Sequence, residues 1–361
     1  MRKRHSNPRL LVLRSGSGPG NNLIRALRAG LASCRIVGTH DDAFYLRRSV
    51  ADRNYLLPPV TGRQFLSVVK RLIDAEKIDL VIPNSEADVK SISDLRDKLP
   101  CKVFLPRTEV IEKCSDKYEL AVLLRRNGLP VPPTYPITAL NDADRLYRSL
   151  PKGLQLWCRI RRGSGSVGAI PVKNAAQVRH WIKYWQEMRA IPPGSFTLSE
   201  YLPGRDYCVE SIWKDGRLVA TKMHQRLAYF VAGSNASGVS SSAAVAKMVS
   251  IPGVFNISSK AIRALDPKAS GVFFVDLKED AKGKPCITEI NAGRFANVST
   301  IHDITAKRNM AAIYVRVALG QDVRFDAPSE RVGSGQFVLR DLDTIPLNVT
   351  GGISSKRASW L

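Results

Sequence analysis

Short apolar runs alternate with amphipathic segments through the first 110 residues, and this alternation constrains the fold more than any other feature of the chain. Residues 10–13 form an apolar run, a glycine-rich turn follows at 15–20, and apolar residues then recur at helical spacing over 23–31. Further strands are predicted at 34–38, 79–83 and 101–105, and a second amphipathic helix at 65–73. Strands that alternate with helices predict an open, largely parallel α/β sheet.

The pattern changes after residue 133, where a small lobe is expected. It contains two strands on either side of a glycine loop at 163–168, followed by a helix at 175–188. Beyond residue 196, alternating apolar residues predict an antiparallel sheet with helices, an α+β arrangement. The predicted strands are 207–213, 218–223, 271–277 and 286–290, and the predicted helices are 258–265 and 309–319. We therefore expect three units, at 1–112, 113–195 and 196–361.

At 361 residues with 44% hydrophobic residues, the chain is long enough to bury a sizeable core. Its net charge of +23 would attract nucleic acid or an anionic membrane, but the basic residues are spread along the chain without an RNA-binding signature. We relate the charge to anionic ligands and do not expect nucleic-acid binding as the main function. No run reaches the roughly 18 to 20 apolar residues of a membrane span, and a cytoplasmic protein is expected. The six scattered cysteines are expected to be reduced thiols without a structural metal.

Two predicted neighbouring strands bring together three oxygen-bearing side chains. Asp276 lies in the first strand, Glu289 and Asn291 lie in the second, and a glycine-containing turn separates the two. Residues two apart in a strand point to the same side, so adjacent antiparallel strands can place all three side chains on one face. Carboxylates with an amide oxygen suit Mg²⁺ bound between triphosphate oxygens. A hairpin with solvated acidic residues is the alternative.

This segment resembles the ATP-grasp family, in particular its carbamoyl-phosphate-synthetase-like branch, which has a leading pre-ATP-grasp domain. The family motif is Glu-x-Asn followed by an arginine, and this sequence runs from Glu289 through Asn291 to Arg294, one residue longer than the commonest form. The resemblance implies a Rossmann-like leading domain followed by an ATP-grasp fold. It also implies that Asp276, Glu289 and Asn291 bind Mg²⁺, or alternatively Mn²⁺, and that Arg294 contacts phosphate or an acyl phosphate.

A glycine- and serine-rich segment follows a basic cluster at 159–162. Backbone amides in such a flexible segment can approach phosphate groups, which suits a loop that closes over ATP, whereas an ordinary hairpin turn is the alternative. The resemblance assigns the phosphate contact to Arg159. Because Ile160 stands where the family usually has proline, Arg161 is a candidate substitute. The predicted ATP contacts of this segment are Arg159, Arg161, Gly163, Ser164, Gly165 and Ser166.

Residues 199–206 resemble the hinge between the two lobes of the family. Backbone groups at a strand end can bind the adenine edge, and a nearby carboxylate can accept hydrogen bonds from ribose hydroxyls. This assigns Glu200, Tyr201 and Leu202 to adenine. Asp206 is assigned to ribose, and a surface turn capped by Asp206 is the alternative.

Four further basic residues are candidates for binding anionic ligands. Lys117 opens a helix where the family has a phosphate-binding basic residue, although a solvated lysine in a first helical turn is common. Lys222, His224 and Arg226 alternate along a strand and would face one side. We predict that Lys222 contacts the nucleotide and that His224 and Arg226 contact the substrate, with His224 able to titrate near neutrality. A solvent-facing basic strand is the alternative.

The glycine turn at 16–20, with Asp41 after the second strand, invites a dinucleotide-binding interpretation. The spacing is G-x-G-x-G, and the proline within it removes a backbone donor that a pyrophosphate would use. In the resembling family the leading domain often contributes to the acceptor site instead, and we predict that Glu86, after a strand of this domain, contacts the substrate. Segments 230–242 and 295–303, small and polar in composition, are expected to be flexible loops of the substrate pocket.

The resemblance spans nearly the whole chain and implies an ATP-dependent ligase that forms C–N bonds. The γ-phosphate would pass to a small-molecule carboxylate or bicarbonate, and an amine or other nucleophile would attack the acyl phosphate, with release of ADP and phosphate. Arg159, Lys117 and Arg294 would position the reactants and neutralise charge. The alternatives are a non-ligating ATP-binding module, a basic nucleic-acid-associated protein and, last, a NAD-dependent oxidoreductase. A homo-oligomer is compatible with the sequence.

Overall fold

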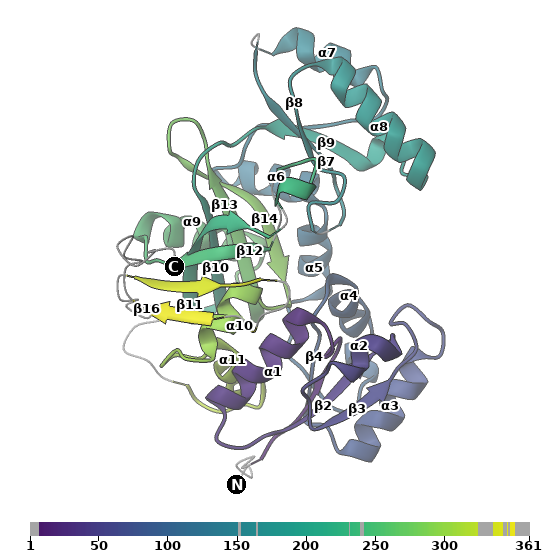
Figure 1. Cartoon of the computed structure of the whole chain (residues 1–361), viewed down its shortest axis with the longest axis vertical. Helices are drawn as coiled ribbons and strands as arrows, with labels where there is room; N and C mark the ends of the chain where they lie inside the picture. Colours follow the sequence, from purple (N-terminus) through teal and green to yellow (C-terminus); the bar gives the residue numbers. More distant parts are fainter. Residues whose placement is uncertain are drawn as a thin grey trace, which may run out of the picture.

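The computed structural model describes residues 7–150, 153–163, 165–230, 232–238, 242–323, 335–341, 345 and 347–350. Three sheets follow one another along the chain: a five-stranded sheet, a four-stranded sheet and a seven-stranded sheet. In Figure 1 the four-stranded sheet and its helices α7 and α8 project from one end of the molecule, while the other two sheets lie next to each other. This mixed architecture confirms the predicted fold class.

The leading sheet has the strand order β3-β2-β1-β4-β5, and its neighbouring strands are parallel. The strands are β1 (Arg9–Val12), β2 (Arg35–His40), β3 (Arg53–Leu56), β4 (Leu80–Ile82) and β5 (Lys102–Val103). The accompanying helices are α1 (Gly18–Gly30), α2 (Ala43–Arg47), α3 (Phe65–Glu76) and α4 (Glu86–Leu95). Leu10, Leu11 and Val12 are fully buried, as expected for a parallel strand that is covered on both faces. The strand order confirms the Rossmann-like prediction.

The glycine turn after β1 packs against the short helix α2. The Ser17 hydroxyl accepts a hydrogen bond from the Gly20 amide and caps α1, and Pro19 lies in the first helical turn. A Cβ atom on Gly16 would lie 1.7 Å from the Tyr45 carbonyl oxygen, so glycine is needed for this close backbone approach. A carbonyl oxygen thus lies against the turn where a dinucleotide-binding turn needs room for a pyrophosphate, which weighs against the NAD interpretation.

The four-stranded sheet of the small lobe has the order β6-β9-β7-β8 and is antiparallel. Its strands are β6 (Thr134–Pro136), β7 (Leu156–Ile160), β8 (Ile170–Val172) and β9 (Phe196–Glu200), and its helices are α7 (Asp142–Ser149) and α8 (Ala175–Arg189). Ile182 of α8 shares a buried cluster with Leu156 and Leu198 of the sheet. Strand β9 begins beyond the predicted boundary at residue 195 and still pairs within this sheet.

The central sheet has the order β14-β13-β10-β11-β12-β15-β16 and is antiparallel. Its strands are β10 (Asp206–Lys214), β11 (Arg217–Tyr229), β12 (Ala243–Met248), β13 (Gly271–Glu279), β14 (Pro285–Ala292), β15 (Gln336–Leu339) and β16 (Leu347–Thr350). The helices α5 (Thr108–Ser115), α6 (Lys117–Arg126), α9 (Pro252–Leu265), α10 (Asn297–Asp303) and α11 (Met310–Ala318) complete the fold. Leu23 and Leu27 of α1 share one buried cluster with Val272 and Met310, so the leading domain and the central sheet have a common core.

The prediction of a flexible loop at 295–303 is wrong, because residues 297–303 form helix α10 and residues 298–303 are buried. The helix packs against α1 and β11, and the small side chains of Ser299 and Thr300 permit close packing. Parts of the other expected loop, residues 231 and 239–241, lie outside the described residues. The sequence prediction also omits several elements that the structure contains, among them β3, α2, α4, α7 and β12.

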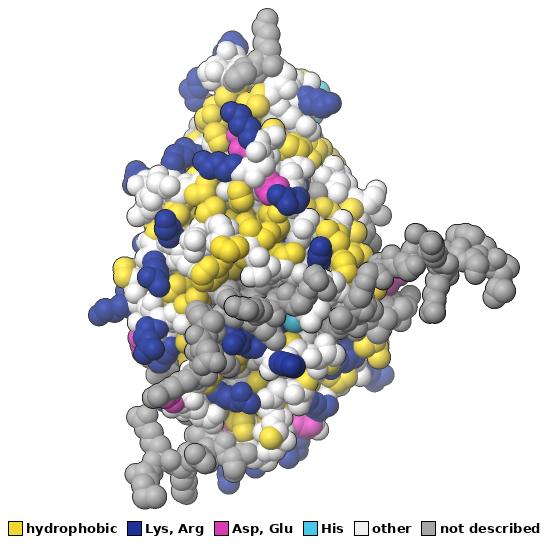
Figure 2. All heavy atoms as spheres, turned by 90° about the vertical axis from the view of Figure 1, so that its left-hand side faces the viewer, with side chains coloured by type: hydrophobic (Ala, Val, Ile, Leu, Met, Phe, Trp, Pro, Cys, Tyr) yellow, Lys and Arg dark blue, Asp and Glu magenta, His cyan; other side chains and the backbone are white. Residues whose placement is uncertain are grey.

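The described surface bears on the expected partners in two ways. Within the described ranges, no helix combines the length and the apolar character needed to cross a bilayer. Figure 2 shows Lys and Arg side chains scattered singly and in small groups among apolar and uncharged surface. On that face the basic residues therefore do not gather into one continuous band.

Candidate active site

Strands β13 and β14 place the three predicted metal ligands on one face. Asp276 lies directly opposite Glu289 in the strand register, and Asn291 lies two residues further along β14. The Asn291 Nδ2 group donates a 3.0 Å hydrogen bond to Glu289 Oε1. In the part of the chain that is described, no group of three or more His, Cys, Asp or Glu side chains could hold a metal ion. The candidate metal site thus consists of two carboxylates and an amide oxygen.

Basic side chains surround the two carboxylates. Lys117 Nζ lies 3.8 Å from Glu289 Oε2, and Arg226 Nη2 donates a 2.6 Å hydrogen bond to Asp276 Oδ1. Burial opposes ionisation of Glu289, but the neighbouring cations, Lys117 foremost, outweigh it and lower the pKa of this carboxyl group. At Asp276 burial outweighs the nearby arginine and raises the pKa. Glu289 is therefore the more strongly ionised of the two.

Glu289 lies between two cavities, because its side chain lines both. The first cavity, between the small lobe and the central sheet, is lined among others by Arg159, Ser166, Tyr201, Leu202, Asp206 and Asp276. The second, of about 700 Å³, lies between the leading domain and the β13–β14 hairpin, and its lining includes Arg14, Glu86, Lys117, Gly163, Asn291 and Arg294. A ligand that extends from one cavity to the other would pass Glu289.

Arg159 and Arg161 are close in sequence but have different surroundings. Arg159 lines the first cavity, its Nη2 donates a 3.0 Å hydrogen bond to the Thr288 carbonyl oxygen, and its buried Nε has no hydrogen-bond partner among the described residues. Arg161 instead binds both carboxylate oxygens of Asp116, at 3.2 and 2.8 Å, and lines neither described cavity. Arg159 is therefore placed to meet a phosphate, whereas Arg161 joins the small lobe to the start of α6.

The glycine loop and Lys117 meet at the boundary of the two cavities. The Lys117 ammonium group donates a 2.5 Å hydrogen bond to the Gly163 carbonyl oxygen. Gly163 and Gly165 have positive φ values of 137° and 74°, a conformation that glycine adopts without strain, and Ser166 has a φ of 58°. Ser166 lines the first cavity and Gly163 lines the second, so the loop reaches both. Ser164 lies outside the described residues.

The three predicted adenine contacts line the first cavity where β9 ends. The Glu200 amide donates a 3.0 Å hydrogen bond to the Pro133 carbonyl oxygen, and the Tyr201 amide donates a 3.1 Å bond to that of Gln155. These two amides are thus used to hold the hinge against the small lobe. Leu202, the next residue, has a buried side chain.

Asp206, the predicted ribose ligand, is held by two neighbours. Its Oδ1 accepts a 2.6 Å hydrogen bond from Arg226 Nη1, and its Oδ2 accepts one of 2.6 Å from the Tyr229 hydroxyl. The other terminal nitrogen of Arg226 binds Asp276. Arg226 therefore joins the predicted ribose ligand to a predicted metal ligand.

Of the three basic residues that alternate on β11, only Arg226 lines a described cavity. Lys222 is 4% exposed and forms an ion pair with Asp303, and His224 is 1% exposed. Burial lowers the pKa of His224 well below its usual range, so the expected titration near neutrality is wrong. The structure does not bring Lys222 or His224 to either of the two cavities, and α10 contacts the strand that carries them.

The additional residue in the Glu-x-Asn motif forms a turn. Gly293 has a φ of 91°, and a Cβ atom there would lie 2.8 Å from the Val89 side chain, so glycine is required. Arg294, the next residue, donates a hydrogen bond to Asn291 Oδ1, and its guanidinium lies 4.9 Å from the centre of the Phe274 ring. Because of this turn, Arg294 contacts a candidate metal ligand even though the motif is one residue longer than its commonest form.

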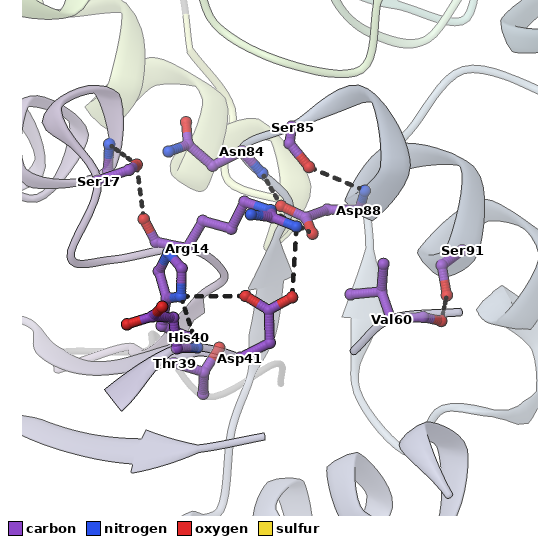
Figure 3. A network of polar contacts seen from close by, with 12 residues as sticks. Arg14, Ser17, Thr39, His40, Asp41, Val60, Asn84, Ser85, Asp88 and Ser91 are labelled. Carbon is purple, nitrogen blue, oxygen red and sulfur yellow. Dashed lines mark hydrogen bonds and ion pairs between the residues drawn. The ribbon is translucent and has the colours of Figure 1, made fainter. Parts of the chain in front are cut away.

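Residues that follow β1 and β4 form a polar network at one edge of the leading sheet (Figure 3). Arg14, with a φ of 51°, lies between Asp41 and Asp88, whose oxygens are 3.5 and 3.4 Å from its guanidinium. Arg14 and Glu86 line the second cavity from this edge. Ligands of open α/β sheets bind where the strand order reverses, here between β1 and β4. The sequence prediction includes Glu86 and omits Arg14, although a basic residue directly after the first strand was a usable signal.

No family model matches the chain, but several solved structures are similar to it. An L-amino acid ligase from Bacillus licheniformis has a TM-score of 0.66 at 15% identity, over 93% of this chain and 79% of that chain. A biotin carboxylase in a β-γ-ATP complex from Campylobacter jejuni has 0.69 at 14%, over 91% and 74%. N5-Carboxyaminoimidazole synthetase from Staphylococcus aureus, complexed with ADP, has 0.66 at 13%, over 92% and 81%. These are ATP-grasp enzymes, and this chain has the ATP-grasp fold, which confirms the predicted resemblance.

Proposed function

We propose that the protein is a Mg²⁺- and ATP-dependent ligase that activates a carboxylate by phosphorylation. The position of Glu289 carries this proposal, because its carboxylate lines both cavities and lies within the influence of Lys117, Arg159 and Arg294. A cation-rich boundary between two cavities suits the transfer of a phosphoryl group from a nucleotide in one to an acceptor in the other. The nucleotide complexes named above, which share the fold, support nucleotide binding in general.

In this proposal ATP occupies the first cavity, with adenine at the hinge and the triphosphate directed toward Glu289. Leu202 offers its backbone amide to the adenine edge, since the amides of Glu200 and Tyr201 are already used within the protein. Asp206 accepts hydrogen bonds from the ribose hydroxyls. Arg159, with an unpaired Nε, and the amides of the glycine loop bind the phosphates.

The donor set of Asp276, Glu289 and Asn291 fits Mg²⁺, and also Mn²⁺, because both ions prefer carboxylate and carbonyl oxygens. An ion bound there would neutralise triphosphate charge and polarise the phosphoryl oxygens. Two contacts support the fit: Asn291 is held against Glu289, and the neighbouring cations keep Glu289 ionised. Arg226 holds Asp276 toward the same face.

The proposed reaction has two steps. A carboxylate oxygen of the substrate attacks the γ-phosphorus, the bond to the bridging oxygen breaks, and ADP leaves. An amine or other nucleophile then attacks the carbonyl carbon of the acyl phosphate, phosphate leaves, and the nucleophile loses a proton. Lys117 and Arg294 line the second cavity, where they orient the transferred group and neutralise its charge. Closure of the glycine loop over them excludes water from the acyl phosphate.

The second cavity is the proposed acceptor site. Glu86 and Arg14 line it from the leading domain, on the side opposite the β13–β14 hairpin. Glu86 can accept hydrogen bonds from an amine, and Arg14 can bind an anionic group. A small molecule that carries a nitrogen nucleophile is therefore the expected acceptor.

The test is ADP release with Mg-ATP across a panel of carboxylic acids, bicarbonate and amines, compared with each component alone. The proposal expects ADP formation that requires both a carboxylate and a nucleophile and that Glu289→Gln abolishes. Glu187→Gln, which changes an exposed carboxylate of α8, is the matched control and should leave turnover unchanged. Tight ATP binding without stimulation by any acceptor would overturn the ligase proposal in favour of a non-ligating ATP-binding module.

A further inference from the structure

Helix α10 is held at both ends by two buried ionisable residues that face each other across neighbouring strands. Glu210 of β10 and Lys222 of β11 are direct partners in the strand register, and both are buried. Glu210 Oε2 accepts a 2.6 Å hydrogen bond from the amide of Ala296, the residue that precedes the helix. The Lys222 ammonium group forms an ion pair with Asp303, the last helical residue. One cross-strand pair thus fixes the start and the end of α10.

The same contacts fix the position of Arg294, which precedes Ala296 by two residues. Arg294 lines the second cavity and donates a hydrogen bond to Asn291, so a shift of Ala296 would move a proposed catalytic group. The helix is also tied to the leading domain, because Asn22 of α1 donates a 3.0 Å hydrogen bond to Asn297 Oδ1. The short segment between β14 and α10 therefore has little freedom while Glu210 holds it.

This cluster is costly for stability. Among the described residues, the buried polar atoms without a hydrogen-bond partner include Glu210 Oε1, His224 Nδ1, Ser299 Oγ and His302 Nδ1. A buried polar atom without a partner costs about 1 to 3 kcal/mol, and apolar residues of similar volume often replace buried ion pairs without loss. Stability alone therefore does not account for a buried glutamate at position 210, which favours a positional role.

We infer that Glu210 is a positioning residue of the transfer reaction, which holds the segment 294–296 so that Arg294 faces the transferred phosphoryl group. The inference rests on the proposed function for its kinetic consequence, while its structural part, the anchoring of 294–303, is independent of the reaction. Glu210 contacts neither proposed cavity, so it acts through Arg294.

The kinetic test compares Glu210→Leu, Glu210→Gln and Arg294→Ala, singly and as the double variant Glu210→Leu/Arg294→Ala. We expect kcat for acceptor-dependent ADP release to fall about 10- to 100-fold in Glu210→Leu, with the KM for ATP within about twofold. Glu210→Gln keeps an oxygen that can accept from the Ala296 amide and should restore kcat to within about threefold of wild type. The double variant should be no slower than Arg294→Ala alone. The inference would be overturned if the losses of kcat in the two single variants multiplied in the double variant, or if Glu210→Gln were as slow as Glu210→Leu.

Hydrogen exchange provides a test that needs no turnover. Glu210→Leu should speed amide exchange in 294–303 while α9 keeps its protection. Asp266→Leu is the matched control, since it removes another buried carboxylate, bound to Arg107, and should not expose 294–303. Unchanged exchange in 294–303 would reject the anchoring role. Faster exchange in Glu210→Leu, together with a wild-type protein that shows no acceptor-dependent turnover, would keep the anchoring role and reject the proposed ligase.

Discussion

The central lobe contains two carboxylate pairs with opposite environments. Asp276 and Glu289 lie on the β13–β14 hairpin and line the cavities, whereas Glu210 lies on β10 beneath α10 and Asp303 ends that helix, and each of these two is at most 1% exposed. Both pairs have basic partners at close range. The difference teaches that the covering helix, more than the residue types, determines whether such charges can serve a ligand or can only hold the protein together.

The cations differ in number as well as in access. Several basic side chains act on Glu289 and lower its pKa, in keeping with a carboxylate that stays ionised for a metal ion. Beneath α10 the Lys222 ammonium group forms an ion pair with Asp303, and Lys222 lies opposite Glu210 in the strand register. Burial and the charge of Asp303 raise the pKa of Glu210 to about 8. The open pair, Asp276 and Glu289, is therefore suited to bind added cations, whereas the sealed pair, Glu210 and Asp303, is buried around Lys222.

The largest expected effect is on stability, which should depend more on the buried pair than on the pair that lines the cavities. Asp303→Ala leaves the Lys222 ammonium group buried without its carboxylate, and we expect the free energy of unfolding to fall by about 3 to 5 kcal/mol. Urea unfolding followed by circular dichroism measures this change. The corresponding change in the open pair, Asp276→Ala, should cost far less because Arg226 keeps Asp206 as a partner.

A second variant checks the cause of that loss. Replacing both charges, as in Lys222→Met/Asp303→Leu, removes the unpaired charge and should recover most of the stability. If the double variant is as unstable as Asp303→Ala, the loss comes from the cap that Asp303 provides to the Ala311 amide and the ion pair is not its source.

The next effect is on activity, which should depend on the pair that lines the cavities. Glu289→Gln removes the ionised carboxylate that lies between the cavities, and we expect ADP formation to fall about 100-fold or more. Stability should change little, since the glutamine amide can still contact the Asn291 side chain. Steady-state ADP release with saturating Mg-ATP measures the loss, and a variant that retains more than about a tenth of wild-type turnover contradicts the role of Glu289.

The sequence predicted the open pair better than the sealed one for a physical reason. Asp276, Glu289 and Asn291 follow from strand alternation alone, which is a local property of the chain. Whether Lys222 and His224 meet solvent depends instead on α10, whose small polar residues Ser299 and Thr300 are typical of loops. That helix is buried through contact with α1, far away in sequence, and no local pattern indicates the contact. The same reason applies to Arg161, whose partner Asp116 lies 45 residues away.

A smaller effect depends on pH. Glu210 in the folded protein stays protonated up to a pKa of about 8, while in the unfolded chain it ionises near the ordinary pKa of a glutamate, 4.5. Its contribution to stability is thus full below pH 4.5 and is lost as the pH rises toward 8. The facing histidines stay neutral over most of this window, because burial lowers the pKa of His302 to about 4 and that of His224 well below its usual range.

Glu210→Gln removes this titration. We therefore expect its stability relative to wild type to rise by about 2 kcal/mol between pH 5 and pH 8, measured by urea unfolding at unit intervals of pH. Glu279→Gln is the control for loss of a buried carboxylate, because hydrogen bonds with Arg205 outweigh burial and lower the pKa of Glu279, and its difference from wild type should not rise over the same range. If the free energies of unfolding of wild type and Glu210→Gln changed in parallel with pH, ionisation of Glu210 under α10 would not destabilise the fold.

The smallest effect distinguishes two arginines of the open region. Arg159 lines the first cavity, the proposed nucleotide site, and Arg159→Ala should weaken Mg-ATP binding about tenfold through loss of a phosphate contact. Arg161→Ala removes a two-point ion pair with Asp116, so it should lower the free energy of unfolding by about 1 kcal/mol and leave ATP affinity within about twofold. Isothermal titration with a non-hydrolysable ATP analogue and urea unfolding measure the two quantities. An equal loss of affinity in both variants would mean that the small lobe must be docked on α6 before it binds phosphate, because Arg161 could then act only through that docking.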